Sequence, residues 1–146
     1  MDRTSTAILV VAAGTAIGAQ APINKELARS VGTFQAATIS FAIGTALLIV
    51  IVAISGGFGG MADVGNAPWW SLLGGICGVA IVSASIVGVG RLGAGGVTAA
   101  VVAGQLTASV VIDQYGLLGV EKQALTPAKI AGIGLLAVAV LLIVKD

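Results

Sequence analysis

Charged residues are scarce in this sequence. Among 146 residues, Lys and Arg number 7 and Asp and Glu number 6, which together make up 9% of the chain. A soluble domain normally carries about 25% charged residues, so this chain has too few to cover a surface that faces water. Hydrophobic residues make up 58% and the mean hydropathy is +1.11, which favours a chain that lies in lipid. The net charge of +1 gives no basic surface that would indicate binding to nucleic acid.

Histidine is absent, and cysteine occurs once. The lack of histidine excludes histidine metal sites and histidine proton relays. Cys77 cannot form an internal disulfide, and it stands in an apolar run, where a packed side chain is more common than a nucleophile. The sequence also offers no cluster of metal ligands, no closely spaced carboxylate pair and no serine with an evident base. We therefore predict no catalytic residue, no metal site and no cofactor.

Long uncharged runs are what the chain has instead. A helix needs roughly 20 residues, at about 1.5 Å each, to cross about 30 Å of hydrocarbon. Four of the runs between charged residues are long enough, and the fifth is long enough if Lys129 and Lys145 extend toward the lipid headgroups. The runs are too long and too uniformly apolar for the strands of a membrane barrel. The sequence therefore predicts an all-α membrane protein with a single transmembrane domain over residues 1–146 and five transmembrane helices, at about 5–24, 33–55, 68–90, 94–113 and 127–144.

The first of these runs also has features of a secretory signal peptide. Arg3 gives a weak positive start, and Ala19-Gln20-Ala21 resembles a cleavage site of small residues. Pro22 would follow the scissile bond, which is a poor position for processing, and the rest of the chain is itself a membrane protein. We therefore expect this run to be the first transmembrane helix.

The positive charges do not select an orientation in the membrane. Lys and Arg in short loops prefer the cytoplasmic side. With five helices, three such residues share the side of the N-terminus and four lie on the opposite side: Arg3, Lys122 and Lys129 against Lys25, Arg29, Arg91 and Lys145. Two alternatives follow from this balance. Either folding or a partner decides the orientation, or the chain inserts both ways and pairs with a second copy of itself.

An odd number of helices makes the second alternative useful. The two termini then lie on opposite sides, so a copy inserted upside down supplies an inverted repeat. Inverted repeats are a common construction of alternating-access transporters, whose substrate site lies near the middle of the membrane between the repeats. We expect one five-helix chain to be too small to enclose a solute pathway alone, and therefore expect an antiparallel homodimer.

Polar residues inside the predicted helices are candidates for a substrate site, because they are costly in lipid. Gln20 and Asn24 are four residues apart and share one helix face, with Pro22 between them. They mark either the end of the helix at the headgroups or a kink that faces a substrate.

A second polar row lies in the fourth predicted helix. Gln105, Ser109 and Asp113 are spaced by four residues, which places them within roughly 80° of arc. Gln105 is the deepest strongly polar side chain, and it either binds substrate or hydrogen-bonds a neighbouring helix. Asp113 is either a solvated boundary carboxylate or a buried proton carrier. Arg91 lies at the opposite end of this helix, so an antiparallel dimer would bring one subunit's Arg91 and the other's Asp113 to the same membrane face, as a charge pair or as two solvated charges.

Small residues recur at four-residue spacing. The pairs are Gly14 with Gly18, Ser40 with Gly44, and Gly74 with Gly78. Small residues permit the close approach of two helices, so we predict that these positions, and above all the four glycines of the first and last pairs, serve helix packing.

Several segments of the sequence, taken in order, carry a recognisable pattern. They are Gly18-Ala19-Gln20-Ala21-Pro22-Ile23-Asn24-Lys25, Ile39-Ser40-Phe41 with Gly44-Thr45, Pro68-Trp69-Trp70 with Gly74-Gly75, Arg91-Leu92-Gly93, Val102-Ala103-Gly104-Gln105-Leu106, and Ser109 with Ile112-Asp113-Gln114-Tyr115-Gly116-Leu117. Over nearly the whole chain they resemble the YdcZ-like family of bacterial inner-membrane proteins, in the drug/metabolite transporter (DMT) superfamily. Two positions depart from the family pattern. Gly90 stands where proline usually precedes Arg-Leu-Gly, and Gln114 stands where histidine commonly follows the aspartate, which weakens any role in proton coupling.

The resemblance implies a multi-pass protein of the bacterial inner membrane, similar to half of a ten-helix DMT transporter and associated with dual-topology or oppositely oriented pairs. It implies a transport class but no particular substrate. Our leading hypothesis is a small-solute transporter, an exporter, that works by alternating access as an antiparallel homodimer. Its expected partners are the lipid bilayer, a second copy of the chain and a small molecule. The main alternative is a non-transporting assembly subunit that packs against another membrane protein, and a membrane enzyme is a distant third.

Overall fold

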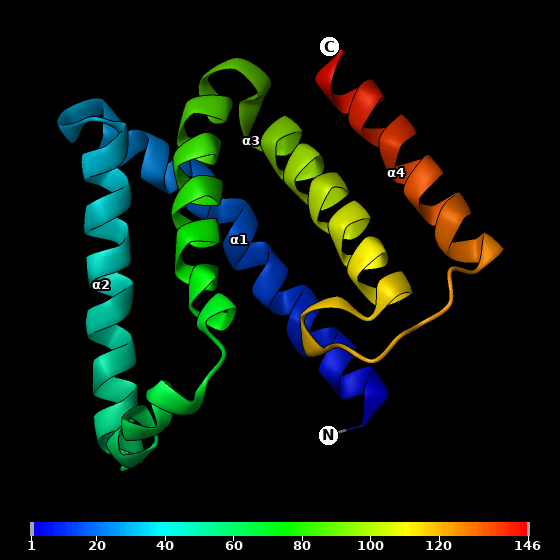
Figure 1. Ribbon diagram of the computed structural model, residues 1–146. Coiled ribbons are helices and arrows are strands. Elements are labelled where there is room, and N and C mark those ends of the chain that lie inside the picture. The colour runs from blue at the N-terminus through cyan, green and yellow to red at the C-terminus, as the bar shows by residue number, and fades with distance from the viewer. Residues whose placement is uncertain (1, 146) are drawn as a thin grey trace. The chain divides into compact units, whose positions relative to one another are not determined.

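The computed structural model describes residues 2–145, apart from the side chain of Arg3. Every regular element in this range is helical (Figure 1). In chain order the elements are α1 (Arg3–Val31), α2 (Thr33–Ile54), the 3₁₀ segments η1 (Gly57–Asn66) and η2 (Trp69–Leu73), α3 (Gly74–Tyr115), the short 3₁₀ segment η3 (Leu117–Gly119) and α4 (Pro127–Val144). The prediction of an all-α chain is therefore confirmed.

Four helical segments of the described range are long and apolar enough to cross a membrane. The longest of them, Trp69–Tyr115, joins η2 to α3 and contains a break at Gly93, where φ is 68° and ψ is 171°. Residues 74–92 and 94–115 are therefore two helical stretches within α3, and counting them separately gives five spans. Helices suit lipid because they satisfy every backbone N–H and C=O within the segment, apart from those at their ends.

Glycines with positive φ, rather than charged residues, separate these helices. Gly32 has φ 94° between α1 and α2, and Gly93 has φ 68° inside α3. Residues with a Cβ rarely adopt this backbone, and at these two positions the backbone departs from the helical conformation. α1 accordingly continues past the expected end at residue 24 to Val31, and Pro22 lies inside it without ending it.

The chain divides into two compact units. The middle unit is Gln20–Val87, and the terminal unit is Met1–Ala19 together with Gly88–Asp146. The boundaries between them fall inside α1 and inside α3. The single transmembrane domain over residues 1–146 stays a prediction.

The middle unit has a small apolar core between α2 and the first stretch of α3, which lie side by side in Figure 1. Its buried residues are Ala36, Ala37, Val82 and Ile86, and Leu27 and Ala28 of α1 pack against them. Because alanine side chains are short, α2 approaches its neighbours closely, which fixes the positions of the polar groups further along these helices.

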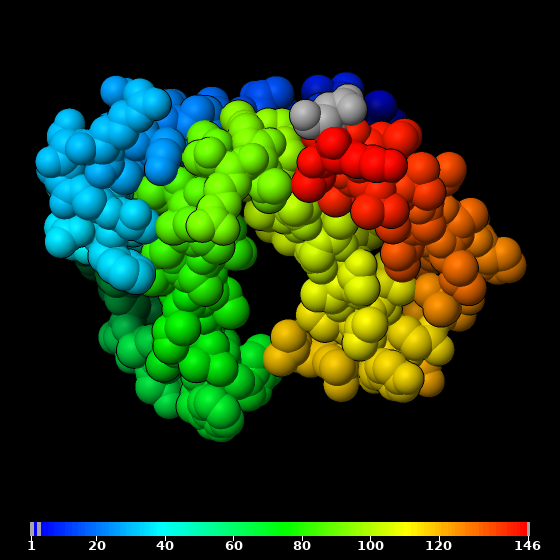
Figure 2. All heavy atoms as spheres, turned by 90° about the horizontal axis from the view of Figure 1, so that it is seen from above, coloured from blue at the N-terminus to red at the C-terminus, as the bar shows by residue number. Residues whose placement is uncertain are grey.

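The terminal unit brings α4 against the second stretch of α3. A Cβ built at Gly96 would lie 3.6 Å from Cγ2 of Val144, so the end of α4 lies beside the start of the 94–115 stretch, as Figures 1 and 2 show. At its other end, α4 begins with Thr126 as N-cap, whose side chain accepts a hydrogen bond from the backbone N–H of Lys129 at 3.2 Å. The Thr-Pro start of this helix is the usual arrangement, since proline lacks the N–H that would otherwise need a partner.

Large apolar side chains are exposed along every long helix. Examples are Val11, Ile43, Ile76 and Leu135, which are 71%, 66%, 66% and 72% exposed. Soluble proteins rarely expose such surfaces continuously, whereas in a bilayer these side chains contact lipid tails.

Candidate substrate site

Asn24 is a buried polar residue of the middle unit, with 3% of its surface exposed. The hydroxyl of Ser40 donates a hydrogen bond to Oδ1 of Asn24 at 2.8 Å, which joins α1 to α2. α1 continues beyond Asn24 to Val31, so Asn24 does not mark the end of the helix. The helix end expected near residue 24 therefore lies at Val31, beyond Asn24, and a kink that faces a substrate stays a prediction.

A pocket of about 260 Å³ lies beside this hydrogen bond, and we call it the Gln20 pocket. α1 contributes one side chain, α2 most of the wall and α3 one side chain. The lining residues are Gln20, Ser40, Phe41, Gly44, Thr45, Leu48 and Val82. One residue with an amide and two with hydroxyls thus line a hollow whose other lining residues are apolar.

A second pocket, of about 280 Å³, lies between α2 and α3, and we call it the Ser83 pocket. Its lining residues are Phe34, Ala37, Thr38, Phe41, Val79 and Ser83. The hydroxyl of Thr38 is already engaged, since it donates to the backbone oxygen of Phe34 at 2.9 Å. The hydroxyl oxygen of Ser83 is buried and has no hydrogen-bond partner within the described part of the chain.

Neither pocket has a charged residue in its lining. Amide and hydroxyl groups donate and accept hydrogen bonds but do not change protonation state near neutral pH. The chemistry that these groups support is therefore recognition of a polar solute, and not acid–base catalysis.

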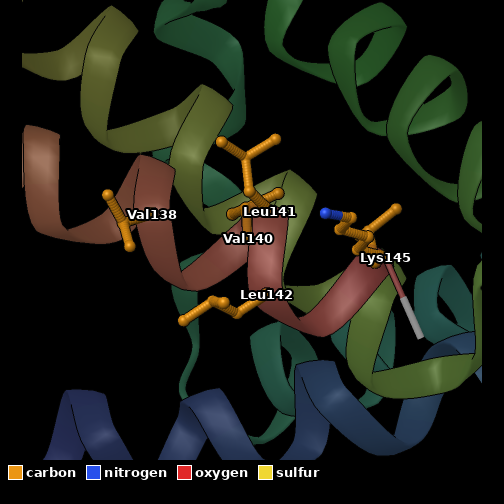
Figure 3. A pocket seen from close by; sticks show the side chains of 6 residues that line it. Val138, Val140, Leu141, Leu142 and Lys145 are labelled. Atoms are coloured by element: carbon orange, nitrogen blue, oxygen red, sulfur yellow. The ribbon is translucent and has the colours of Figure 1, made fainter.

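The pockets of the terminal unit are more apolar. One, of about 620 Å³, follows α4, and its side chains project from that single helix in Figure 3; its lining is Val138, Val140, Leu141, Leu142, Val144 and Lys145. The other, of about 450 Å³, is lined by Gly18, Ala94, Gly95, Thr98, Ala99, Val102, Leu136 and Ile143. These linings suit lipid tails or another helix better than a hydrophilic solute.

Gln105 and Ser109 are exposed on the 94–115 stretch of the terminal unit. They line none of the four pockets described above. Their predicted contact with substrate therefore stays a prediction.

Asp113 and Gln114 hold the loop that follows α3. Nζ of Lys129 lies 3.9 Å from Oδ2 of Asp113, and both side chains are about a third exposed. The backbone N–H of Gln123 donates to the carbonyl oxygen of Asp113 at 2.8 Å, and that of Leu125 donates to Oε1 of Gln114 at 2.6 Å. Asp113 thus has a cation at 3.9 Å, and its carbonyl oxygen anchors the following loop; its role as a boundary carboxylate or a proton carrier stays a prediction.

Arg91 is exposed at the end of the 74–92 stretch, and its predicted pairing with Asp113 across a dimer stays a prediction. Of the four glycines expected to serve packing, Gly78 lies against another helix: a Cβ built there would be 3.2 Å from Cζ of Phe41. A Cβ built at any of the other three would lie more than 4 Å from every atom of its own unit, apart from the adjoining residues of its own helix. These three are Gly14, Gly18 and Gly74.

Sequence reasoning missed part of this site. It counted Ser40 only as a small residue and did not single out Phe41, Thr45 or Ser83 as site residues. Two hydroxyls at positions 40 and 45 of an apolar helix, following Gln20 and Asn24 in the preceding one, were the available signal.

Comparison with known proteins identifies the family of this chain. The model of a family described as "Putative inner membrane exporter, YdcZ" matches residues 5–142, almost the whole chain. The chain belongs to the YdcZ family. A relative is the inner membrane protein YdcZ of Escherichia coli (strain K12), which is 29% identical over 127 residues, covering 86% of this chain and 85% of the relative. No solved structure matches the chain.

Membership of the YdcZ family confirms the resemblance read from the sequence. The chain is a multi-pass protein of the inner membrane, since the relative is an inner membrane protein and the helices are long and apolar enough to span. The description of the YdcZ family as exporters supports a membrane transporter, and an exporter is not a class of enzyme.

Proposed function

We propose that this chain exports a small solute by alternating access. The Gln20 pocket carries this proposal, because polar side chains from two helices line a hollow whose other lining residues are apolar. Polar groups are expensive in a membrane interior and commonly mark the path of a substrate or ion. The match to a family of exporters supports both the class and the direction of transport.

The working unit in this proposal is an antiparallel homodimer that corresponds to a ten-helix DMT transporter. The near balance of Lys and Arg between the two sides supports insertion in both orientations. A copy in the opposite orientation supplies the inverted repeat that alternating access commonly uses, with the substrate between the repeats. In this arrangement Gln20 and Asn24 of the middle unit and Gln105 and Ser109 of the terminal unit contribute to the solute path.

Solute flux in proteoliposomes tests the transport function. Purified protein is reconstituted, and efflux is followed across a panel of small metabolites, with protein-free liposomes as the blank. The proposal expects at least one solute whose flux depends on the protein and falls in Gln105→Leu, which keeps the helix apolar. Protein-independent flux for every solute, together with obligatory co-purification of a different membrane protein, would favour an assembly subunit.

Topology reporters test the antiparallel dimer. A C-terminal reporter active in the cytoplasm and one active in the periplasm should both give signal. Adding two lysines at one end should fix one orientation and reduce flux. Signal from one side alone contradicts the self-antiparallel arrangement.

Charge exchange tests the contact between subunits that the dimer predicts. Arg91→Asp and Asp113→Arg should each weaken the dimer or its flux, and the double exchange should restore part of the loss. Lys129 already lies near Asp113, so Lys129→Met provides the matched control within one subunit. Strictly additive losses in the double exchange would exclude the pair between subunits.

A further inference from the structure

Phe41 stands between the two pockets of the middle unit. Its side chain lines both the Gln20 pocket and the Ser83 pocket. Their volumes, about 260 and 280 Å³, each lie just below the roughly 300–1,000 Å³ that is typical of small-molecule sites. Joined into one, they would fall inside that range. Phe41 lines both pockets, so its position bears on whether one molecule can occupy the two together.

The ring of Phe41 has room because α3 carries a glycine opposite it. A Cβ built at Gly78 would lie 3.2 Å from Cζ and 3.5 Å from Cε1 of the ring. Phe41 is also 37% exposed, so it is not enclosed on all sides. Side chains move between a few staggered rotamers, and another rotamer of Phe41 would remove the wall between the pockets.

Ser83 supplies a hydrogen-bonding group that lacks a partner. Its hydroxyl oxygen is buried at the Ser83 pocket, and no group in the described part of the chain bonds to it. Buried polar groups are nearly always hydrogen-bonded, so a molecule that displaces a side chain of this pocket and reaches the hydroxyl with a polar atom would satisfy it. Phe34 and Phe41 provide aromatic walls on the same pocket.

Both pockets lack charged side chains in their lining. An ionised molecule that entered them would lose its hydration without gaining a counter-ion, which is strongly unfavourable. The lining therefore favours an uncharged molecule.

We propose that the two pockets form one substrate site for an uncharged molecule with an apolar body and hydrogen-bonding groups, and that Phe41 sets the size of the molecule accepted. The polar end of that molecule lies against Gln20, Ser40 and Thr45, and its apolar body lies between the aromatic walls of the Ser83 pocket. This inference rests on the proposed export function, since it names the substrate class of the same site.

Binding to the full chain in lipid nanodiscs tests the charge preference. Three probes share one ring and differ at the polar end: benzyl alcohol is neutral, whereas benzylamine is a cation and benzoate an anion near pH 7. Equilibrium dialysis, with empty nanodiscs subtracted, should show saturable binding of benzyl alcohol that is at least about tenfold tighter than that of either ion. No saturable binding of benzyl alcohol, or equal or tighter binding of an ion, overturns the proposal.

Substitutions at the wall test the role of Phe41. The longer probe 4-phenyl-1-butanol should bind about tenfold tighter to Phe41→Ala than to the wild type, relative to benzyl alcohol. Phe58→Ala removes a ring that lines neither pocket and should leave this ratio unchanged. Phe41→Leu keeps an apolar side chain and should give an intermediate ratio if Phe41→Ala folds poorly. An unchanged ratio in both Phe41 variants overturns the proposal.

The glycine opposite the ring offers an independent variant. Gly78→Ala should push the ring into a pocket and weaken benzyl alcohol binding severalfold, whereas Gly74→Ala, one turn earlier with nothing of its unit near the new Cβ, should not. If Gly78→Ala and Gly74→Ala bind benzyl alcohol equally well, the proposed role of Phe41 between the two pockets is contradicted.

Flux assays separate this inference from the proposed function. Protein-dependent flux whose size preference is the same in Phe41→Ala and in the wild type contradicts the inference and leaves export standing. Probe binding that follows the expected pattern, without flux of any solute, supports the site and contradicts export.

Discussion

The two units of this chain differ in the burial and hydrogen bonding of their polar side chains. In the middle unit, the amide of Asn24 is buried and hydrogen-bonded to Ser40, and neutral polar groups line two pockets. In the terminal unit, Gln105 and Ser109 are exposed on an apolar helix, and the charged Asp113 holds a loop together with Lys129. Polar groups of the middle unit thus form a buried hydrogen bond or line a pocket, whereas Gln105 and Ser109 of the terminal unit are exposed and line none of the four pockets.

This contrast shows how sequence position alone can mislead about polar residues in membrane helices. Asn24 and Gln105 are both amides inside apolar runs, and the deeper of the two by sequence is Gln105. The structure nevertheless buries Asn24, because short side chains at Ala36 and Ala37 let α2 approach its neighbours. Packing between helices, and not depth in a run, decides which amide is satisfied within a unit.

Asn24→Leu should have the largest effect on stability among the changes that test this contrast. The variant leaves the Ser40 hydroxyl without its partner in a partly buried place, where a buried group left unbonded costs at most about 1–3 kcal/mol. Gln105→Leu makes a similar amide-to-leucine change at an exposed position and should cost nothing. Unfolding in mixed micelles measures both. If the two variants unfold alike, the contrast between the units fails; if adding Ser40→Ala to Asn24→Leu recovers part of the loss, the hydrogen bond is its cause.

The positive-φ glycines should matter about equally in both units. Gly32→Ala in the middle unit and Gly93→Ala in the terminal unit both force a Cβ onto a backbone that is nearly exclusive to glycine, at a cost of about 1–2 kcal/mol. Gly14→Ala lies in a helix with nothing of its own unit near the new Cβ, so it should be neutral or stabilising. Thermal unfolding in detergent compares the three. If Gly14→Ala loses as much thermal stability as Gly32→Ala and Gly93→Ala, the positive φ of Gly32 and Gly93 is not the reason for their effect.

The two ion pairs found among the described residues should differ only slightly in their contribution to stability. Lys129 and Asp113 are 3.9 Å apart and about a third exposed, whereas Arg29 and Glu26 are 2.6 Å apart and about 70% exposed. Exposed pairs contribute at most about 1 kcal/mol, so Asp113→Asn should loosen its loop modestly and Glu26→Gln should have less effect. Hydrogen exchange of the amides at 116–125 reports the first change. If the amides of this loop exchange as slowly in Asp113→Asn as in the wild type, the ion pair does not hold the loop, and its backbone hydrogen bonds do.

The smallest expected effect is at the start of α1. Hydrogen bonds from the side chain and the backbone N–H of Ser5 lower the pKa of Asp2 below its ordinary 3.8. A lowered pKa in the folded state means that this contribution is present above pH 3.8 and is lost as pH falls through the folded pKa. Protection of the Ser5 amide should therefore decline in acid, and Asp2→Asn, which also caps helices, should remove that dependence. If protection of the Ser5 amide still declines in acid in Asp2→Asn, a group other than the Asp2 carboxyl causes the decline.

Much of the fold was predictable from the sequence, because lipid imposes simple rules. The apolar runs predicted the helices, and Thr126-Pro127 predicted the start of α4. The end of α1 was not predictable from charge, since a helix can leave the membrane and continue until a residue such as Gly32 stops it. Counting charges therefore locates spans better than it locates helix ends.

The site was predictable only in part. Gln20 and Asn24 were identified from their chemistry and spacing, and the structure places Gln20 in a pocket and Asn24 in a hydrogen bond beside it. Phe41 and Ser83 were not identified, because an aromatic or a hydroxyl in an apolar helix is ordinary until the neighbouring helix is known. Their importance depends on Gly78 and on the register of α2 against α3, which no local pattern encodes.

Flux with matched glutamine variants tests most directly the claim that the middle unit contains the transport site. Gln20→Leu removes the amide from the Gln20 pocket, and Gln35→Leu makes the same change at an exposed position of α2 outside both pockets. Both are reconstituted in proteoliposomes at equal protein content, with the solute that the wild type transports. We predict that Gln20→Leu loses about tenfold or more in flux and that Gln35→Leu keeps the flux of the wild type. Equal flux in the two variants would contradict the assignment of the site.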